Sequence, residues 1–291
     1  MQGIELNGMY IPMTDDVINH NIPRNKMKDI TEYYEDGILW SRLHGINGFR
    51  KFEDIYVGDY FKMSRPISAY NQDSNYQLTG SQWVTIAGIN TLMGNGDGSN
   101  FIDYNHLVMV PGKGEEGDFH FGRSRMNATH TTEGGYANSE MNTVTIGEAV
   151  SSGSTADNAT INQQLYAEYG EHLKTTRELL SNAVDANRIG RIDSGASVGW
   201  AWYSCQAVLM SEVEVYGSIV FSSSGYDTGN ANTRLPLFAF STKTMNNRSA
   251  WYWLKDVASA SYFCYCGGDG NSSCNGAGNA NSFVRPRFVL S

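Results

Sequence analysis

The sequence is poor in charged residues and cysteine, and it has no long apolar run. Only 18% of its 291 residues are charged and four are cysteine, whereas 31 are glycine and 17 are tyrosine. Sparse charge with abundant glycine and aromatic residues favours a loop-rich protein that contains β-structure over a helical one. No apolar run approaches the roughly 18 residues that a membrane-spanning helix needs. We therefore expect no membrane insertion.

Basic residues do not cluster, and the formal net charge is −9. A nucleic-acid partner is therefore not expected. The first residues, MQGIE, lack the basic and apolar regions of a secretory signal peptide. We expect a soluble cytoplasmic product, which would need a route other than a signal peptide to reach the outside of a cell. The length allows one large domain or two small ones.

The four cysteines do not form a zinc pattern. Three of them, Cys264, Cys266 and Cys274, lie in one short segment, and Cys205 lies well before it. Zinc sites need two pairs of ligands at spacings of two to four residues, which is not the spacing here. No metal and no cofactor are expected, and the sequence leaves open whether the cysteines pair as disulfides.

The chain is organised around residues 251–291. Residues 251–254, WYWL, predict a buried strand, and residues 283–290, FVRPRFVL, predict a closing strand. Residues 258–282 between them consist almost entirely of Ser, Ala, Gly, Asn, Cys, Asp and Tyr. Tyrosine supplies rigid contact area, and Ser, Gly and Asn supply adaptable hydrogen bonds, as in antibody paratopes. A binding surface is one interpretation, and a long Gly/Asn turn region between two strands is the other.

The rest of the chain predicts an α+β protein in which helices are segregated from antiparallel strands. Strands or strand–turn units are expected at 55–63, 83–89, 106–111, 200–205, 207–211 and 212–217, and a short helix at 29–43. Residues 161–173 place apolar side chains every fourth position, which predicts a helix. Thr175 and Glu178 match a capping box that would open a second helix carrying Leu179, Leu180, Ala183 and Val184 inward. We interpret the charged side chains of this region as lying on solvent-exposed helix faces: Glu168, Glu171, His172 and Glu178.

Several separate stretches resemble one large family. These are IYVGD at 55–59, GGYANSEM at 134–141, HL at 172–173 with RELL at 177–180, LMSEVEVYG at 209–217, YWL at 252–254 and VRPRFVL at 284–290. From about Phe52 to Ser291 the chain resembles the C-type-lectin-like domains at the C-termini of phage and bacterial proteins. The resemblance implies antiparallel sheets with two helices. It divides the chain into an attachment or oligomerisation segment, residues 1–50, and a ligand-binding domain, residues 51–291.

Within that family, the region 251–284 resembles the variable part of proteins diversified by retroelements. There, adenines are mutagenised, so Asn codons change to codons for residues such as Ser, Gly, Asp, Tyr and Cys. Lys, Glu, Gln, Met and Trp cannot be reached from these codons, and none of them occurs in 258–282. The resemblance implies a diversified ligand-binding face. The residues expected to line it are Ser259, Ser261, Tyr262, Tyr265, Gly268, Asp269, Asn271, Ser273, Asn275 and Asn279.

The resemblance therefore implies a receptor-binding protein of a phage virion, a tail adhesin, and not an enzyme. Its partners would be a host-surface protein or glycan and, through residues 1–50, other virion proteins. A homo-oligomer is expected, and a trimer is one form it could take. Tyr262 and Tyr265 would be the anchors of the contact, whereas Trp251, Trp253, Arg285 and Phe288 would be scaffold.

Two alternatives stay open. One is a structural virion protein, a capsid decoration or baseplate component that reuses the fold. The other is an enzyme, of the formylglycine-generating type or a glycan hydrolase. The calcium-binding Glu-Pro-Asn, Gln-Pro-Asp and Trp-Asn-Asp motifs of sugar-binding lectins do not occur, and no copper-site motif surrounds the cysteines. Asp256 and Asp269 are the only acids of the last stretch, and nothing pairs them as a hydrolase would require.

Overall fold

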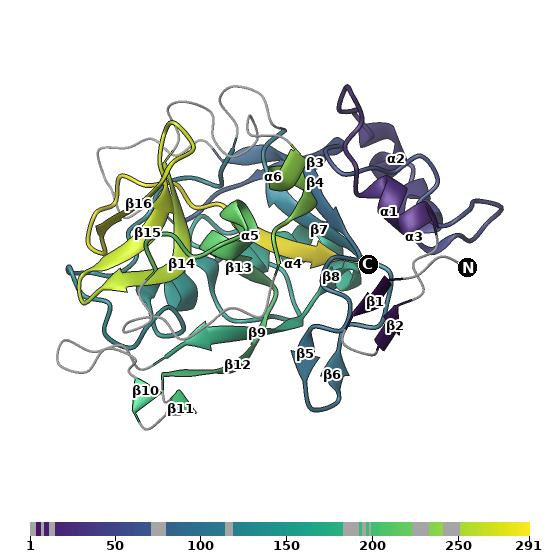
Figure 1. Ribbon diagram of the computed structural model, residues 1–291. Helices are drawn as coiled ribbons and strands as arrows, with labels where there is room; N and C mark the ends of the chain where they lie inside the picture. Colours follow the sequence, from purple (N-terminus) through teal and green to yellow (C-terminus); the bar gives the residue numbers. More distant parts are fainter. Residues whose placement is uncertain are drawn as a thin grey trace.

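The structure is a computed structural model that describes residues 4–6, 9–11, 15–70, 80–113, 119–182, 192–193, 196–197, 199–222, 233–240 and 251–291 (Figure 1). This part of the chain mixes few helices with mostly antiparallel strands. The helices are α1 (Asp15–His20), α2 (Thr31–Glu35), α3 (Ile38–His44), α4 (Ile161–Tyr169), α5 (Glu212–Tyr216) and α6 (Pro236–Phe240), with a π-helical turn at Met141–Ile146 and a 3-10 turn at Gly170–His172. Within the described ranges, none of the helices has the length and apolar character that crossing a bilayer requires.

The strands fall into one six-stranded sheet and several smaller ones. The main sheet contains β3 (Tyr60–Ile67), β4 (Ser81–Ile89), β7 (Leu107–Pro111), β8 (Leu173–Lys174), β13 (Ala207–Leu209) and β17 (Pro286–Leu290). A three-stranded sheet contains β14 (Tyr252–Ser259), β15 (Tyr262–Cys266) and β16 (Ser272–Gly276). Two-stranded ribbons pair β1 (Ile4–Leu6) with β2 (Met9–Ile11), β5 (Gly96–Asp97) with β6 (Asn100–Phe101), β9 (Thr176–Ser181) with β12 (Trp200–Cys205), and β10 (Ile192–Asp193) with β11 (Ala196–Ser197).

The closing strand of the chain lies inside the main sheet. The strand order is β13-β17-β7-β4-β3, and β8 also pairs with β17. All these pairs are antiparallel. Every residue of β7 and β17 is buried. Helix α4 packs on β3 and helix α6 packs on β4. The strands predicted at 83–89, 106–111 and 283–290 are confirmed with small shifts at their ends.

Helix α4 begins where the sequence predicted it and ends earlier. Thr160 caps it, because the Thr160 hydroxyl accepts from the Gln163 N–H and the Gln163 side chain accepts from the Thr160 N–H. The apolar residues Ile161, Leu165 and Tyr169 are buried, as their spacing predicted. The helix ends at Tyr169, and the chain passes through a 3-10 turn into β8.

The second predicted helix is wrong, because residues 176–181 form strand β9. Thr176, Glu178 and Leu180 are buried while Arg177 and Leu179 between them are half-buried, which is the two-residue period of a strand. The partner is β12, with Leu180 opposite Ala201. Glu178 is therefore not on a solvated face. The Glu178 carboxylate that suggested a cap accepts instead from the Thr176 hydroxyl and from Arg287.

Residues 212–216 form helix α5, where a strand–turn unit was predicted over 212–217. Ser211 caps this helix, since its hydroxyl accepts from the Glu214 N–H and the Glu214 carboxylate accepts from the Ser211 N–H. The helix ends at Gly217, which has the left-handed φ of 81° that favours glycine. Alternating Glu and Val over 212–215 suggested a strand, but the cap at Ser211 determines the helix.

Two predictions near the N-terminus need smaller corrections. The helix expected at 29–43 is broken into α2 and α3 by Gly37, whose φ is 70°. The strand expected at 55–63 begins only at Tyr60. Before it, the Asp59 carboxylate accepts from the N–H groups of Lys28 and Tyr56, which holds a turn there.

The described residues of 15–50 pack on the same core as the rest of the chain. Ile30, Leu39 and Leu43 are fully buried within that core. The Ile30 N–H donates to the carbonyl of Tyr60, the first residue of β3, at 2.8 Å. Helices α1, α2 and α3 lie at the opposite end of the molecule from β14, β15 and β16 (Figure 1). Attachment to other virion proteins through residues 1–50 stays a prediction.

Candidate functional site

The region predicted to bind forms the antiparallel meander β14–β15–β16 (Figure 1). Trp253 lies opposite Tyr265, and Tyr265 lies opposite Ser273. Strand β14 contains two register shifts before it reaches Ser259. Residues 258–282 therefore contribute strands as well as turns, and the segment is neither an isolated loop nor a linker.

Buried side chains fix this meander on the body of the protein. Trp253 and Phe263 are fully buried, as are the thiols of Cys264 and Cys266. The Trp253 indole Nε1 donates to the carbonyl of Ser124 at 2.8 Å. A buried tryptophan whose N–H is satisfied combines apolar burial with a directional contact. The backbone of the meander is thereby held independently of its outward side chains.

Most of the predicted face is accessible. Nine of the ten predicted residues are partly or fully exposed, and the tenth, Gly268, is buried. Gly268 is therefore corrected from a contact residue to part of the turn. Among the predicted scaffold residues, Trp253, Arg285 and Phe288 are buried as expected, but Trp251 is 46% exposed. Trp251 is thus corrected from scaffold to surface.

Five of the predicted residues gather at one end of the meander: Ser259, Ser261, Tyr262, Asn275 and Asn279. We call them the Tyr262 cluster. The Ser261 carbonyl accepts from the Ala277 N–H at 2.9 Å, and the Asn279 amide donates to the Asn275 Oδ1 at 2.6 Å. Tyr262 is 45% exposed, the most open of the large side chains in the meander. The structure thus brings one aromatic residue together with small polar neighbours.

The other predicted residues lie apart from that cluster. Asp269 and Asn271 occupy the turn at the opposite end of β15, roughly 13 Å away at about 3.3 Å per residue. Tyr265 and Ser273 lie between the two ends. Because side chains alternate along a strand, Tyr265 and Tyr262 point to opposite faces of the sheet. The two predicted anchors therefore do not form one contact patch.

Tyr265 also packs on the framework. Its ring lies edge-on to Trp253, with centroids 6.5 Å apart and an interplanar angle of 76°. This is the geometry that aromatic pairs prefer. Part of the Tyr265 ring thus packs against the protein itself, and Tyr262 is more accessible to a ligand.

His130 completes the Tyr262 cluster and was not predicted. A Cβ at Gly276 would come within 2.3 Å of the His130 Nδ1, so the imidazole lies directly over that glycine. The loop that carries His130 is tied down, since the Thr132 hydroxyl donates to the Ser259 carbonyl at 2.8 Å. His130 is itself exposed. No local sequence pattern links His130 to Gly276, which lies far along the chain.

A buried carboxylate organises the opposite end of the meander. Glu212 is fully buried, and its carboxylate accepts from the N–H groups of Val220, Phe221 and Ser222. It also accepts from the hydroxyl of Ser272 on β16 at 2.5 Å. One acid therefore holds an apolar loop beside the meander, and the loop side chains Val220 and Phe221 are about half exposed. The sequence pattern gave no sign of this contact.

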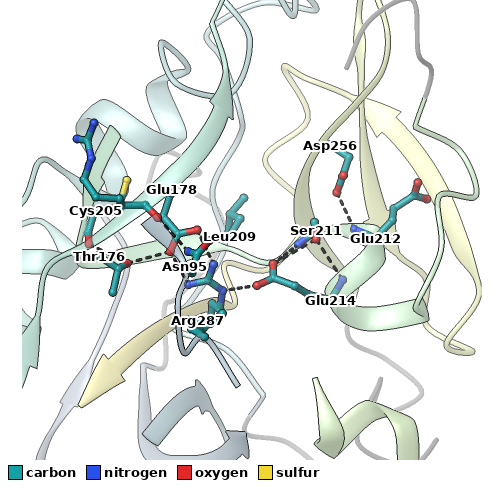
Figure 2. A network of polar contacts seen from close by, with 12 residues as sticks. Asn95, Thr176, Glu178, Cys205, Leu209, Ser211, Glu212, Glu214, Asp256 and Arg287 are labelled. Carbon is teal, nitrogen blue, oxygen red and sulfur yellow. Dashed lines mark hydrogen bonds and ion pairs between the residues drawn. The ribbon is translucent and has the colours of Figure 1, made fainter. Parts of the chain in front are cut away.

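A buried ion-pair network joins the main sheet to β9 and α5 (Figure 2). Arg287 of β17 donates to Glu178 of β9 at 3.0 and 2.6 Å and also donates to Glu214 of α5. Burial raises the pKa of Glu178, but the charges of Arg287 and Lys255 and the hydrogen bonds from Arg287 and Thr176 together offset this, so the pKa lies below its ordinary value. Burial lowers the pKa of Arg287, and the two carboxylates raise it by more. Glu178, predicted to be solvated, is thus a central structural charge.

The two acids of the last stretch have different surroundings. Asp256 is buried, and its Oδ2 accepts from the Glu212 N–H at 2.7 Å, whereas Asp269 is exposed on a turn. All four cysteines carry thiols and not disulfides. Within the ranges that the structure describes, no group of three or more His, Cys, Asp or Glu residues could hold a metal ion.

Comparison of the chain with protein-family models, with curated proteins and with solved structures gives no match. The residues and contacts of the described structure are therefore the basis for assigning a function.

Proposed function

We propose that the protein is a receptor-binding protein of a phage virion, a tail adhesin, which contacts a host-surface protein or glycan through the meander β14–β15–β16. The observation that carries the proposal is that buried and accessible side chains have separate roles within residues 251–284. Buried Trp253 and Phe263 hold the backbone, while nine of the ten predicted contact residues remain accessible. Such a surface can change its side chains without loss of the fold.

The Tyr262 cluster is the principal contact within this proposal. It combines one exposed aromatic ring with short hydroxyl and amide side chains, and binding hot spots are enriched in tyrosine. Tyr265 contributes less to contact, because it packs against Trp253. The ligand chemistry that fits is a polar surface with an apolar spot for the ring, which a protein or a glycan can offer.

The C-type-lectin-like assignment belongs to the same proposal. An α+β body with antiparallel strands is compatible with it. Residues 1–50 would attach the protein to other virion proteins or support a homo-oligomer. Several copies on one particle would raise the overall affinity through effective concentration, so that a modest affinity per copy suffices.

Catalysis has less support than binding. The Asp256 carboxylate is occupied by a backbone N–H, and Asp269 lies on an exposed turn. A glycosidase needs two carboxyl groups about 5–10 Å apart across its substrate. Asp256 is buried and Asp269 is exposed, and the proposal assigns the protein no enzymatic step.

Sequencing the 3′ end of the gene across one natural population tests the proposal. We expect substitutions in adenine-containing codons at Asn271, Asn275 and Asn279. Asn162 is the matched control, since its codon also contains adenines but its side chain is buried and donates to the Gly147 carbonyl at 2.7 Å. It should not vary. Identical 251–291 segments across isolates would contradict the proposal and favour a structural virion protein.

A further inference from the structure

Cys264 and Cys274 lie directly opposite each other on neighbouring antiparallel strands. Strand β15 pairs with β16 without a register shift from Tyr262 opposite Gly276 to Cys266 opposite Ser272. The same register continues beyond both strand ends. The Ala277 N–H donates to the Ser261 carbonyl at one end.

The hydrogen bonds at the two ends determine which type of pair the cysteines form. At the second end, the Gly267 N–H donates to the Asn271 carbonyl at 2.7 Å. Residues 261 and 267 are thus both in hydrogen-bonded pairs, and such pairs alternate with non-hydrogen-bonded pairs along an antiparallel ladder. Cys264 lies an odd number of residues from both. The Cys264–Cys274 pair is therefore of the non-hydrogen-bonded type.

That position has the geometry a disulfide requires. In a non-hydrogen-bonded pair the Cα atoms are about 4.5 Å apart and the side chains approach closely, and disulfides span Cα separations of about 4.4–6.8 Å. Cys266 is a poorer partner for Cys274, because it faces Ser272 and reaches Cys274 only diagonally, at about 7–8 Å. Cys205 belongs to β12, in a different sheet.

We propose that Cys264 and Cys274 form a cross-strand disulfide when the protein meets an oxidising small-molecule disulfide, such as oxidised glutathione. Cys274 is the accessible thiol and reacts first: its thiolate attacks one sulfur of the small disulfide, and one glutathione leaves as a thiolate. The Cys264 thiolate then attacks the Cys274 sulfur of the mixed disulfide and displaces the second glutathione. Both protons end on glutathione, so one disulfide and two protein thiols become one protein disulfide and two free thiols.

The cross-link would fix the hairpin that carries the candidate binding face. It spans β15 and β16 at their middle, between the Tyr262 cluster at one end and the turn with Asn271 at the other. Burial and the charge of Glu212 raise the pKa of the Cys274 thiol. Oxidation should therefore become faster as the pH rises, because the thiolate is the attacking form. The inference rests on the strand register and stands whether or not the protein is an adhesin.

Peptide mapping of the folded full-length protein tests the proposal. The protein is incubated with a glutathione redox buffer, remaining thiols are alkylated, and the chain is then cut on the N-terminal side of aspartate. Cleavage before Asp256 and Asp269 separates Cys264 and Cys266 from Cys274. We expect peptides 256–268 and 269–291 to be recovered as one disulfide-linked pair, with a mass two hydrogens below their sum.

Three variants assign the bond. Cys266→Ser should give the linked pair to the same extent as the wild-type protein, whereas Cys264→Ser and Cys274→Ser should give at least ten-fold less. Oxidation should raise the urea midpoint of the wild-type protein and leave that of Cys274→Ser unchanged. Two results would overturn the proposal. One is a linked pair that persists in Cys264→Ser. The other is a folded Cys266→Ser variant whose thiols stay reduced at a glutathione ratio that oxidises the same chain unfolded in urea.

Discussion

Arg287 forms a bidentate ion pair with Glu178, in which its two terminal nitrogens donate to the two carboxylate oxygens at 3.0 and 2.6 Å. Both side chains are buried. The same guanidinium contacts Glu214, which caps helix α5. One arginine from the closing strand thus connects the main sheet, the β9–β12 ribbon and α5 (Figure 2). The planar, permanently charged guanidinium can serve two carboxylates at once, which lysine cannot do in this geometry.

Removing Arg287 should destabilise the protein strongly. Arg287→Met leaves Glu178 and Glu214 buried without their cation, and breaking a buried pair from one side costs about 3–5 kcal/mol. Glu178→Gln should cost less, because Arg287 keeps Glu214. Urea unfolding of each variant measures these costs. Arg125→Ala is the control, since its pair with Glu140 is partly exposed and should contribute below about 1 kcal/mol. Equal losses in Arg287→Met and Arg125→Ala would contradict the account.

His106 should make stability fall as the pH decreases from about 6.5 to about 4. Its Nδ1 lies 2.9 Å from the Tyr104 carbonyl and its Nε2 accepts from the Leu92 N–H, so the buried imidazole is neutral. Burial lowers the pKa of His106 to about 4. Between these pH values the unfolded chain binds a proton at His106 and the folded chain does not. The free energy of unfolding is therefore highest above pH 6.5 and decreases as the pH falls below it. The loss of unfolding free energy due to His106 is about 3 kcal/mol.

Urea midpoints between pH 7 and pH 4.5 measure this effect. His106→Gln should be less stable overall but show a shallower decline with falling pH. His120, whose pKa burial lowers to about 3, contributes in the same direction. A wild-type slope in His106→Gln would show that the imidazole is not held neutral.

Glu212→Gln should release the loop beside β16. An amide can offer only one oxygen where the carboxylate accepts from three backbone N–H groups and the Ser272 hydroxyl. Hydrogen bonds to charged groups contribute about 1.5–3 kcal/mol, so amide exchange at Val220 and Phe221 should become roughly ten-fold faster or more. Ser272→Ala removes a single donor and is the milder comparison. Unchanged exchange in Glu212→Gln would refute the role of the carboxylate.

Much of the strand framework could be predicted from the sequence, because short apolar runs such as 106–111 are typical of buried strands. Helix α4 could also be predicted from its four-residue spacing. The capping-box pattern itself misled at Thr175 and Glu178. Glu178 is buried because Arg287 reaches it from far along the chain, and a partner at that distance leaves no local pattern. The corresponding pattern at Ser211 and Glu214 was correct, yet the alternation of Glu and Val concealed it.

The candidate face could be predicted as a segment but not as a geometry. Composition separated the framework residues of 251–291 from the polar ones, and most of the polar ones are accessible. Tyr262 and Tyr265 point to opposite faces because both lie in the one strand β15, which the sequence did not show. His130 and Glu212 contribute from distant segments, and only the folded chain brings them to the meander.

Binding of the labelled full-length protein to bacterial isolates from the source of the gene, measured by flow cytometry, tests the central claim most directly. Tyr262→Ala should lower binding to the susceptible isolate at least ten-fold at an unchanged unfolding midpoint, as expected for a hot-spot tyrosine. Phe101→Ala is the matched control, since Phe101 is a similarly exposed aromatic, 50% against 45%, on the separate β5–β6 ribbon. It should bind like the wild-type protein. Wild-type binding by Tyr262→Ala, or an equal loss in Phe101→Ala, would contradict the account.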